Sequence, residues 1–336
     1  MDEVSNQFIS IDVATAFSLA RDALCSSGGV SQIAECVAKY VVDAELSGHP
    51  SHGLRQISSY CDQAGTPGFR LDVEPNFYYK SAGRGVVDAR EGLGYRAMEI
   101  AVDETATAAL SSGIAMCAVI RCGHAGRAGA WVERGLSNGC ITFLALGGSE
   151  PPFVLAAAPG CEPALHTNPI AIGVPGFRDP MLIDMATSLI AQGKVAVALS
   201  RGNKLPDFAI LDSDRQPSTD PADFYEGGAL LPFGGHKGFG LSAIIEALSV
   251  SFTGADQEGN SPQEGALLIC IDASSYRSEG DLHKSVEKIR ARIHQSGNKQ
   301  SVLAPGDPEV FARKNAEIHI EKIVFEDLIT RAGSKS

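Results

Sequence analysis

The sequence has little positive charge: 28 lysines and arginines stand against 40 aspartates and glutamates, giving a net charge of −12. Nucleic acids and anionic membrane surfaces attract basic protein surface, so this composition argues against either as a partner. No apolar run approaches the ~20 residues that cross a bilayer. The first residues, MDEVSNQF, also lack the basic and apolar regions of a signal peptide. We therefore expect a cytoplasmic protein.

Cysteine and histidine are not arranged as metal ligands. The eight cysteines include no C-x-x-C pair, and several lie in apolar, strand-like contexts such as MCAVI and LLICID, which is typical of reduced, buried thiols. The histidines share no ligand spacing, so we predict no metal site. With 336 residues, of which 44% are hydrophobic, the chain can bury a large core and form two domains.

Hydrophobic periodicity predicts alternating helices and strands. Asp12 is a candidate N-cap for a helix that ends before Gly28, and further helices are expected over 31–48, from Ser51, and over 94–111, 128–137 and 241–251. Strands are expected over 114–120, 140–146, 170–174, 181–184, 208–211 and 266–271. The run from Gly254 to Gly265 indicates a surface loop. This alternation favours an α/β fold.

The stretch Glu226–Gly240, EGGALLPFGGHKGFG, concentrates six glycines around His236 and Lys237. Glycine lets the backbone approach a ligand closely, and a lysine before a helix places positive charge beside a phosphate or carboxylate. A ligand-binding turn and an ordinary glycine-rich turn are both open.

Two segments imitate a dinucleotide fingerprint, G-x-G-x-x-A at 92–97 and at 238–243. Neither follows a first strand of a βαβ unit with an acidic residue about 20 residues further on, which the Rossmann mechanism requires. We therefore predict a fold without a Rossmann domain.

Five short motifs occur in order: SHG at 51–53, GHAG at 123–126, TNPIAIG-P from 167, DMATS from 184 and the glycine-rich stretch. In this order the chain resembles the type-2 malate/L-lactate dehydrogenase family. The resemblance implies a mixed-sheet α/β fold of the L-sulfolactate dehydrogenase type and NAD or NADP as cofactor. It also implies a homodimer, a helical substrate and dimerisation domain over 1–118 plus 296–336, and a cofactor domain over 119–295.

Catalysis requires a proton donor beside the carbon that exchanges the hydride. His52 is the candidate, because imidazole titrates near neutral pH, and we expect it in the first turn of a helix. The resemblance adds Ser51 as a group that orients His52, and Asp184 and Lys194 as further catalytic residues. A buried capping aspartate is the alternative for Asp184.

The substrate carboxylate requires a cation or a cluster of donors. Arg55 would grip a carboxylate through two parallel hydrogen bonds. Relatives carry this arginine four residues after the histidine, where this chain has Gln56, and one residue turns a helical side chain by about 100°. Arg55 and Gln56 both stay open, and Thr167 matches a substrate-contacting threonine.

Several residues are assigned to the cofactor by the resemblance. Arg127 is a candidate partner for a 2′-phosphate, with a solvated loop arginine as the alternative. The full set is His124, Ala125, Gly126, Arg127, Ala128, Asn168, Asp184, Met185, Ala186, His236, Lys237, Pro305 and Gly306.

The sequence is compatible with two functions. The first is an NAD(P)-dependent dehydrogenase of a small 2-hydroxy acid, of malate or lactate type, favoured by Lys194. The alternative is an imine reductase acting on Δ1-piperideine-2-carboxylate or Δ1-pyrroline-2-carboxylate, because some such relatives carry an acidic residue near position 194. Both use a small carboxylate substrate.

Overall fold

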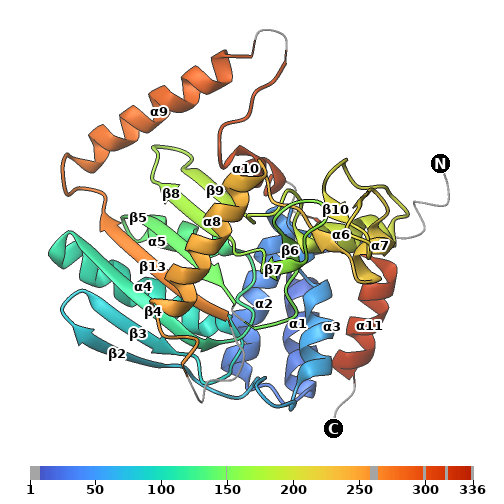
Figure 1. The fold of residues 1–336 in the computed structure, drawn as a ribbon. Helices are drawn as coiled ribbons and strands as arrows, with labels where there is room; N and C mark the ends of the chain where they lie inside the picture. Colours follow the sequence, from blue (N-terminus) through green and yellow to red (C-terminus); the bar gives the residue numbers. More distant parts are fainter. Residues whose placement is uncertain (1–7, 149, 258–263, 298–299, 315–316, 334–336) are drawn as a thin grey trace.

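The centre of the fold is a mixed sheet of seven strands in the order β2-β3-β4-β13-β5-β8-β9 (Figure 1). Only β3 and β4 pair in parallel within this sheet. The computed structural model describes residues 8–148, 150–257, 264–297, 300–314 and 317–333. The seven strands are β2 (Asn76–Ser81), β3 (Arg84–Asp88), β4 (Ile114–Cys122), β5 (Cys140–Gly147), β8 (Ile170–Val174), β9 (Met181–Met185) and β13 (Glu264–Asp272).

A doubly wound Rossmann sheet is parallel, so this antiparallel arrangement confirms the predicted non-Rossmann α/β fold. The boundary predicted at 118/119 falls inside β4, so residues from both sides of it belong to one sheet. Short strands form two further sheets, one of them in the order β11-β10-β12-β6-β7 and the other pairing β1 with β14. Their bounds are β1 (Phe8–Ile11), β6 (Leu155–Ala156), β7 (Pro163–Leu165), β10 (Ile210–Leu211), β11 (Pro217–Ser218), β12 (Ala229–Leu230) and β14 (Ile318–Glu321).

Helices cover both faces of the main sheet because successive side chains of a strand point to opposite faces. On β5, Thr142 lies against Gly135 of α5, whereas Ala145 packs with Ile245 of α8. The helices that pack on these faces are α4 (Gly94–Ser112), α5 (Ala128–Ser137) and α8 (His236–Glu246), which continues as a π-helical turn over Ala247–Ser251.

The N-terminal helices pack on the C-terminal one in the lower part of Figure 1. Asp12 caps α1 as predicted, since its carboxylate accepts from the Thr15 amide at 2.8 Å. The remaining helices are α1 (Val13–Ser26), α2 (Ser31–Leu46), the 3₁₀ turn Pro50–His52, α3 (Arg55–Gln63), α6 (Gln192–Ser200), α7 (Pro221–Tyr225), α9 (Glu279–Gln295), α10 (Asp307–Ala312) and α11 (Lys322–Gly333).

Three predicted boundaries are wrong. His52 lies in a 3₁₀ turn, and α3 begins only at Arg55, because Gly53, with a φ of −91° and a ψ of −148°, leaves the helical conformation between them. The glycine-rich stretch enters α8 at His236 rather than at Leu241, since Gly235 adopts a φ of 61° directly before it. The strand predicted over 208–211 shrinks to two residues, because Phe208 has a φ of 58° in an exposed turn.

The loop predicted from Gly254 to Gly265 is described only in part. Residues 258–263 lie outside the described residues, and β13 already begins at Glu264. All eight cysteines are free, and six of them are buried, as predicted for reduced thiols. No helix among the described residues is long and apolar enough to span a membrane.

Candidate active site

A cavity of about 1050 Å³ lies where the 3₁₀ turn at Pro50–His52, the loop after β4 and the end of β9 meet α6. This volume is at the upper end of the range for small-molecule sites. Many predicted site residues line it, although they are spread over more than 140 positions of the chain: Ser51, His52, Gln56, His124, Ala125, Gly126, Ala128, Thr167, Asn168, Asp184, Met185, Ala186 and Lys194.

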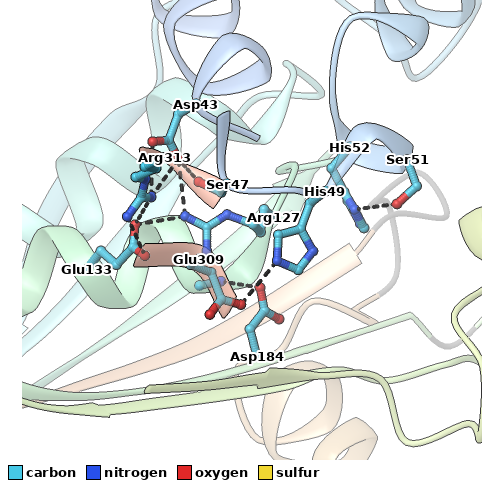
Figure 2. A network of polar contacts seen from close by, with 11 residues as sticks. Asp43, Ser47, His49, Ser51, His52, Arg127, Glu133, Asp184, Glu309 and Arg313 are labelled. Carbon is cyan, nitrogen blue, oxygen red and sulfur yellow. Dashed lines mark hydrogen bonds and ion pairs between the residues drawn. The ribbon is translucent and has the colours of Figure 1, made fainter. Parts of the chain in front are cut away.

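His52 is half-buried in the cavity wall. Its Nδ1 lies 3.1 Å from the Ser51 hydroxyl, the contact expected of an orienting serine (Figure 2). Ser51 is fixed in turn, because a Cβ on Gly193 of α6 would come within 2.5 Å of the Ser51 Cβ. Burial lowers the pKa of His52 to about 3, and the nearby His124 and His49 contribute in the same direction. The imidazole is therefore neutral at physiological pH.

His49 was not predicted as a site residue, although it belongs to the segment SGHPSHGLR. It lines the cavity, and its Nε2 lies 3.1 Å from Glu309 Oε1 on α10. Figure 2 shows its ring next to Glu309 and Asp184. A second unpredicted lining residue, His166, places its Nε2 2.7 Å from the Glu150 carbonyl oxygen. Only the tertiary structure shows that His49 and His166 line the site, because their hydrogen-bond partners, Glu309 and Glu150, are not their neighbours in the sequence.

Asp184 occupies the end of β9 and contacts both the cavity and α5. Its Oδ2 accepts from the Gly129 amide at 2.7 Å, in the first turn of α5. Asp184 thus caps the first turn of α5, the alternative role considered for it in the sequence, and it also lines the cavity. Burial raises the pKa of this carboxyl group, and the Gly129 amide and the charge of Arg127 oppose that rise.

The structure separates Arg55 from Gln56, the two candidates for binding the substrate carboxylate. Arg55, the first residue of α3, forms an ion pair with Glu321 of β14 at 2.9 Å and lines a different, smaller cavity. Gln56 lines the main cavity, where its Nε2 donates to the Ser51 carbonyl at 2.7 Å. Lys194, exposed in the first turn of α6, adds a cation to the same wall.

Arg127 is buried beneath the cavity rather than solvated. Its guanidinium donates to Asp43 at 3.1 Å and to Glu133 at 2.7 Å, and Arg313 binds the same two carboxylates (Figure 2). Its side chain is 2% exposed. Both carboxylates bind Nη2, whereas Nε and Nη1 have no hydrogen-bond partner in the described structure. Because the buried side chain is not part of the cavity lining, this placement offers no surface for a 2′-phosphate.

Four other predicted cofactor residues lie outside the lining of the main cavity. His236 and Lys237 are exposed at the start of α8. Pro305 and Gly306 form a turn beside β9, in which the Pro305 carbonyl accepts from the Leu182 amide at 3.4 Å. Among the described residues there is no group of three or more His, Cys, Asp or Glu side chains arranged to hold a metal ion.

The cavity offers groups that fit a nicotinamide. Asn168 is fully buried, and its Nδ2 donates to Ser242 and Glu246 of α8. Its Oδ1 is a buried acceptor without a hydrogen-bond partner in the described structure. Such an atom is costly unless a ligand N–H pairs with it, and a carboxamide supplies one. Glycine backbone at 126, 147 and 148 leaves room for a flat ring beside it.

Comparison with known proteins identifies the family of the chain. The family model described as malate/L-lactate dehydrogenase matches residues 11–328. The chain is 32% identical to the (2R)-3-sulfolactate dehydrogenase (NADP(+)) of Chromohalobacter salexigens, over 97% of this chain and 98% of that protein. It is 33% identical to the Δ1-pyrroline-2-carboxylate/Δ1-piperideine-2-carboxylate reductase of Pseudomonas putida, over 76% and 78%.

A solved structure agrees. The crystal structure of Δ1-piperideine-2-carboxylate reductase from Pseudomonas syringae superimposes with a TM-score of 0.84 at 28% identity, covering 96% of this chain and 99% of that one. The family model spans almost the whole chain, and the relatives that match over most of their length are dehydrogenases and reductases. The chain therefore belongs to the malate/L-lactate dehydrogenase family and is an oxidoreductase.

Proposed function

We propose that the protein transfers a hydride between NAD(P) and the carbon next to the carboxylate of a small 2-hydroxy acid, in the manner of malate, lactate or sulfolactate dehydrogenases. The observation that carries this proposal is the neutral His52, held by Ser51 in a cavity whose wall also carries Lys194. A neutral imidazole accepts a proton, and an ammonium group attracts an anionic substrate.

The roles follow from the chemistry of oxidation. When the 2-hydroxy acid loses its hydride, the hydroxyl proton must leave, and His52 accepts it. Ser51 keeps the ring in place during this step. Lys194, Gln56 and Thr167 bind the carboxylate and the oxygen of the substrate. In the reverse direction the imidazole requires a proton first, and a bound carboxylate favours its uptake by raising the pKa of His52.

NAD(P), when bound, supplies the hydride acceptor or donor. Asn168 would pair with its carboxamide, and the backbone at 124–126 together with Met185 and Ala186 would line its ring. Arg127 is not part of this set, because it is buried beside Asp43 and Glu133. His236, Lys237, Pro305 and Gly306 lie outside the cavity lining.

An imine reductase is the second candidate. Two of the proteins described above reduce cyclic imines that carry a carboxylate beside the reacting carbon. The same pocket chemistry serves such a substrate, since only the destination of the proton differs. Lys194 in place of an acidic residue favours the hydroxy-acid reaction.

The deciding experiment is oxidation of NADPH and NADH by the purified protein, followed by absorbance. Oxaloacetate, pyruvate, sulfopyruvate and the two cyclic imines are offered in parallel, and the His52→Asn variant serves as the control. We expect turnover with a 2-oxo acid and none with the variant. Turnover with imines alone would replace the first candidate by the second.

We also propose that the enzyme is a cytoplasmic homodimer. Its free, mostly buried cysteines suit a reducing compartment. Ile244 of α8 is 59% exposed, and Phe252, directly after its extension, is 63% exposed. Large apolar side chains left exposed in this way are typical of a surface that a partner copy covers. Light scattering of the wild type and of Ile244→Glu tests this, with a dimer expected for the first and a monomer for the second.

A further inference from the structure

The loop Gly123–Gly126 rests directly on the start of α4. The Gly94 amide donates to the His124 carbonyl at 3.0 Å, and the Gly123 amide donates to the Gly92 carbonyl at 2.9 Å. A Cβ on Gly94 would lie 2.6 Å from the Gly123 carbonyl oxygen. Gly92 and Gly94, the glycines of the G-x-G-x-x-A segment at 92–97, therefore allow the start of α4 to contact the backbone of the loop Gly123–Gly126. In this protein the segment supports an active-site loop instead of binding a dinucleotide as in a Rossmann domain.

Two buried tyrosines lie under this loop. Tyr95 follows Gly94 in α4, and Tyr60 comes from α3; they are 1% and 2% exposed. A Cβ on Gly126, whose φ is 69°, would come within 2.7 Å of the Tyr95 ring, so glycine is needed there as well. The two hydroxyls are 3.0 Å apart, and the Tyr60 hydroxyl is also hydrogen-bonded to His124 Nδ1.

The direction of these hydrogen bonds follows from counting donors and acceptors. Within the described residues, the Tyr95 hydroxyl has one hydrogen-bonding neighbour, Tyr60. If His124 Nδ1 donated to Tyr60, the two tyrosines would have only each other as acceptors, and the O–H of one of them would be buried without an acceptor. A buried donor of this kind is costly and rare. Tyr95 therefore donates to Tyr60, and Tyr60 donates to His124 Nδ1.

The protonation of His124 is then determined. Burial lowers the pKa of His124, and the charge of Glu264 only partly opposes this, so the ring is neutral and carries one proton. Since Nδ1 accepts, that proton resides on Nε2, on the edge of the ring opposite Nδ1. His124 lines the cavity, and its ring stacks on that of His52 at 15° with centroids 5.8 Å apart.

We propose that Tyr60 is a positioning residue that holds His124 in its Nε2–H tautomer, so that His124 presents a fixed N–H donor to the active-site cavity beside His52. The Tyr95 hydroxyl contacts Tyr60 rather than His124 and is not needed for this. Given the proposed function, this donor stabilises the negative charge on the substrate oxygen while His52 handles the proton. A preoriented donor acts without reorganisation during the reaction, which is why its direction matters.

The first experiment is ¹⁵N NMR of the imidazole nitrogens in the uniformly labelled wild-type protein without substrate. The expected signature of His124 is a pyrrole-type Nε2 and a pyridine-type Nδ1, assigned by comparison with His124→Gln. A pyridine-type Nε2 would overturn the proposal. This result is independent of the substrate, so it separates failure of the proposal from failure of the proposed function.

The second experiment compares Tyr60→Phe with Tyr95→Phe. Tyr60→Phe removes the donor to Nδ1 and releases the tautomer, so we expect kcat to fall roughly tenfold to hundredfold. Tyr95→Phe keeps that donor and serves as the matched control, with kcat close to the wild-type value and the wild-type ¹⁵N pattern. Equal kcat values for both variants would contradict the proposal.

The ¹⁵N spectrum of Tyr60→Phe excludes a purely structural effect. Burial still lowers the pKa of His124 in this variant, so the ring stays neutral, but no donor holds Nδ1 as the acceptor. We expect the pyrrole-type signal to be shared between Nδ1 and Nε2. Thermal denaturation of both variants verifies that they are folded, and a wild-type ¹⁵N pattern in a folded Tyr60→Phe would count against the proposal.

Discussion

The carboxyl group of Glu45 should make the free energy of unfolding depend on pH. It lies near the end of α2, and its Oε1 accepts from the Leu54 amide at 2.8 Å, closing the segment that carries Ser51 and His52. Gly53 packs so tightly on this carboxyl group that a Cβ there would lie 2.1 Å from Oε1. Burial raises the pKa of Glu45 to about 7, although the Leu54 amide opposes the rise.

The magnitude follows from linkage. The interval between the ordinary glutamate pKa of 4.5 and about 7 is equivalent to about 3 kcal/mol, at about 1.4 kcal/mol for each tenfold change in the ionisation constant. Because the folded state binds this proton more tightly than the unfolded state, the free energy of unfolding decreases as pH rises from about 4.5 through about 7. Glu45→Gln keeps an acceptor for Leu54 and removes the ionisation.

Urea denaturation at pH 5 and pH 8.5 tests this. We expect Glu45→Gln to be more stable than the wild type by about 3 kcal/mol at pH 8.5 and by less than about 1 kcal/mol at pH 5. Glu326→Gln is the control: it removes only an exposed ion pair with Lys322 at 3.8 Å, so it should change stability little at both pH values. A difference between Glu45→Gln and the wild type that does not change with pH would refute the reasoning.

Three further predictions follow from single contacts, one of them the buried ion pair between Arg290 of α9 and Asp307 of α10. His52→Asn should lower kcat by roughly 10²- to 10⁴-fold while cofactor affinity, measured by fluorescence titration, is unchanged; a weak effect on kcat would remove His52 from the reaction. Gly126→Ala should destabilise the fold by about 1–3 kcal/mol in urea denaturation, because the new methyl group meets the Tyr95 ring at a positive φ. Asp307→Asn should cost about 3–5 kcal/mol by the same measurement, because Arg290 then loses its buried carboxylate; a wild-type midpoint would show that the pair is not stabilising.

Local signals in the sequence were sufficient for much of the fold. The Asp12 cap and the strand over 170–174 are confirmed, and the helix over 128–137 has the predicted bounds. These elements depend on capping chemistry and on hydrophobic periodicity, which act over a few neighbouring residues. The five motifs likewise identified the family, because each is a short run of adjacent residues.

Side-chain direction was decided by the tertiary structure. Whether Arg55 or Gln56 faces the cavity depends on where α3 begins, since each residue turns a helix by about 100°. Glu321, the partner of Arg55, lies 266 positions further along the chain. Local propensity carries no information about such a partner.

The burial of Arg127 and the tautomer of His124 have the same origin. From the sequence alone, Arg127 could be a solvated loop arginine, but in the structure it is buried and paired with Asp43 and Glu133. His124 receives its hydrogen bond from Tyr60, 64 positions away. The sequence determined which elements form and which chemistry is present, whereas packing between distant segments determined which polar groups face the ligand and which pair with each other.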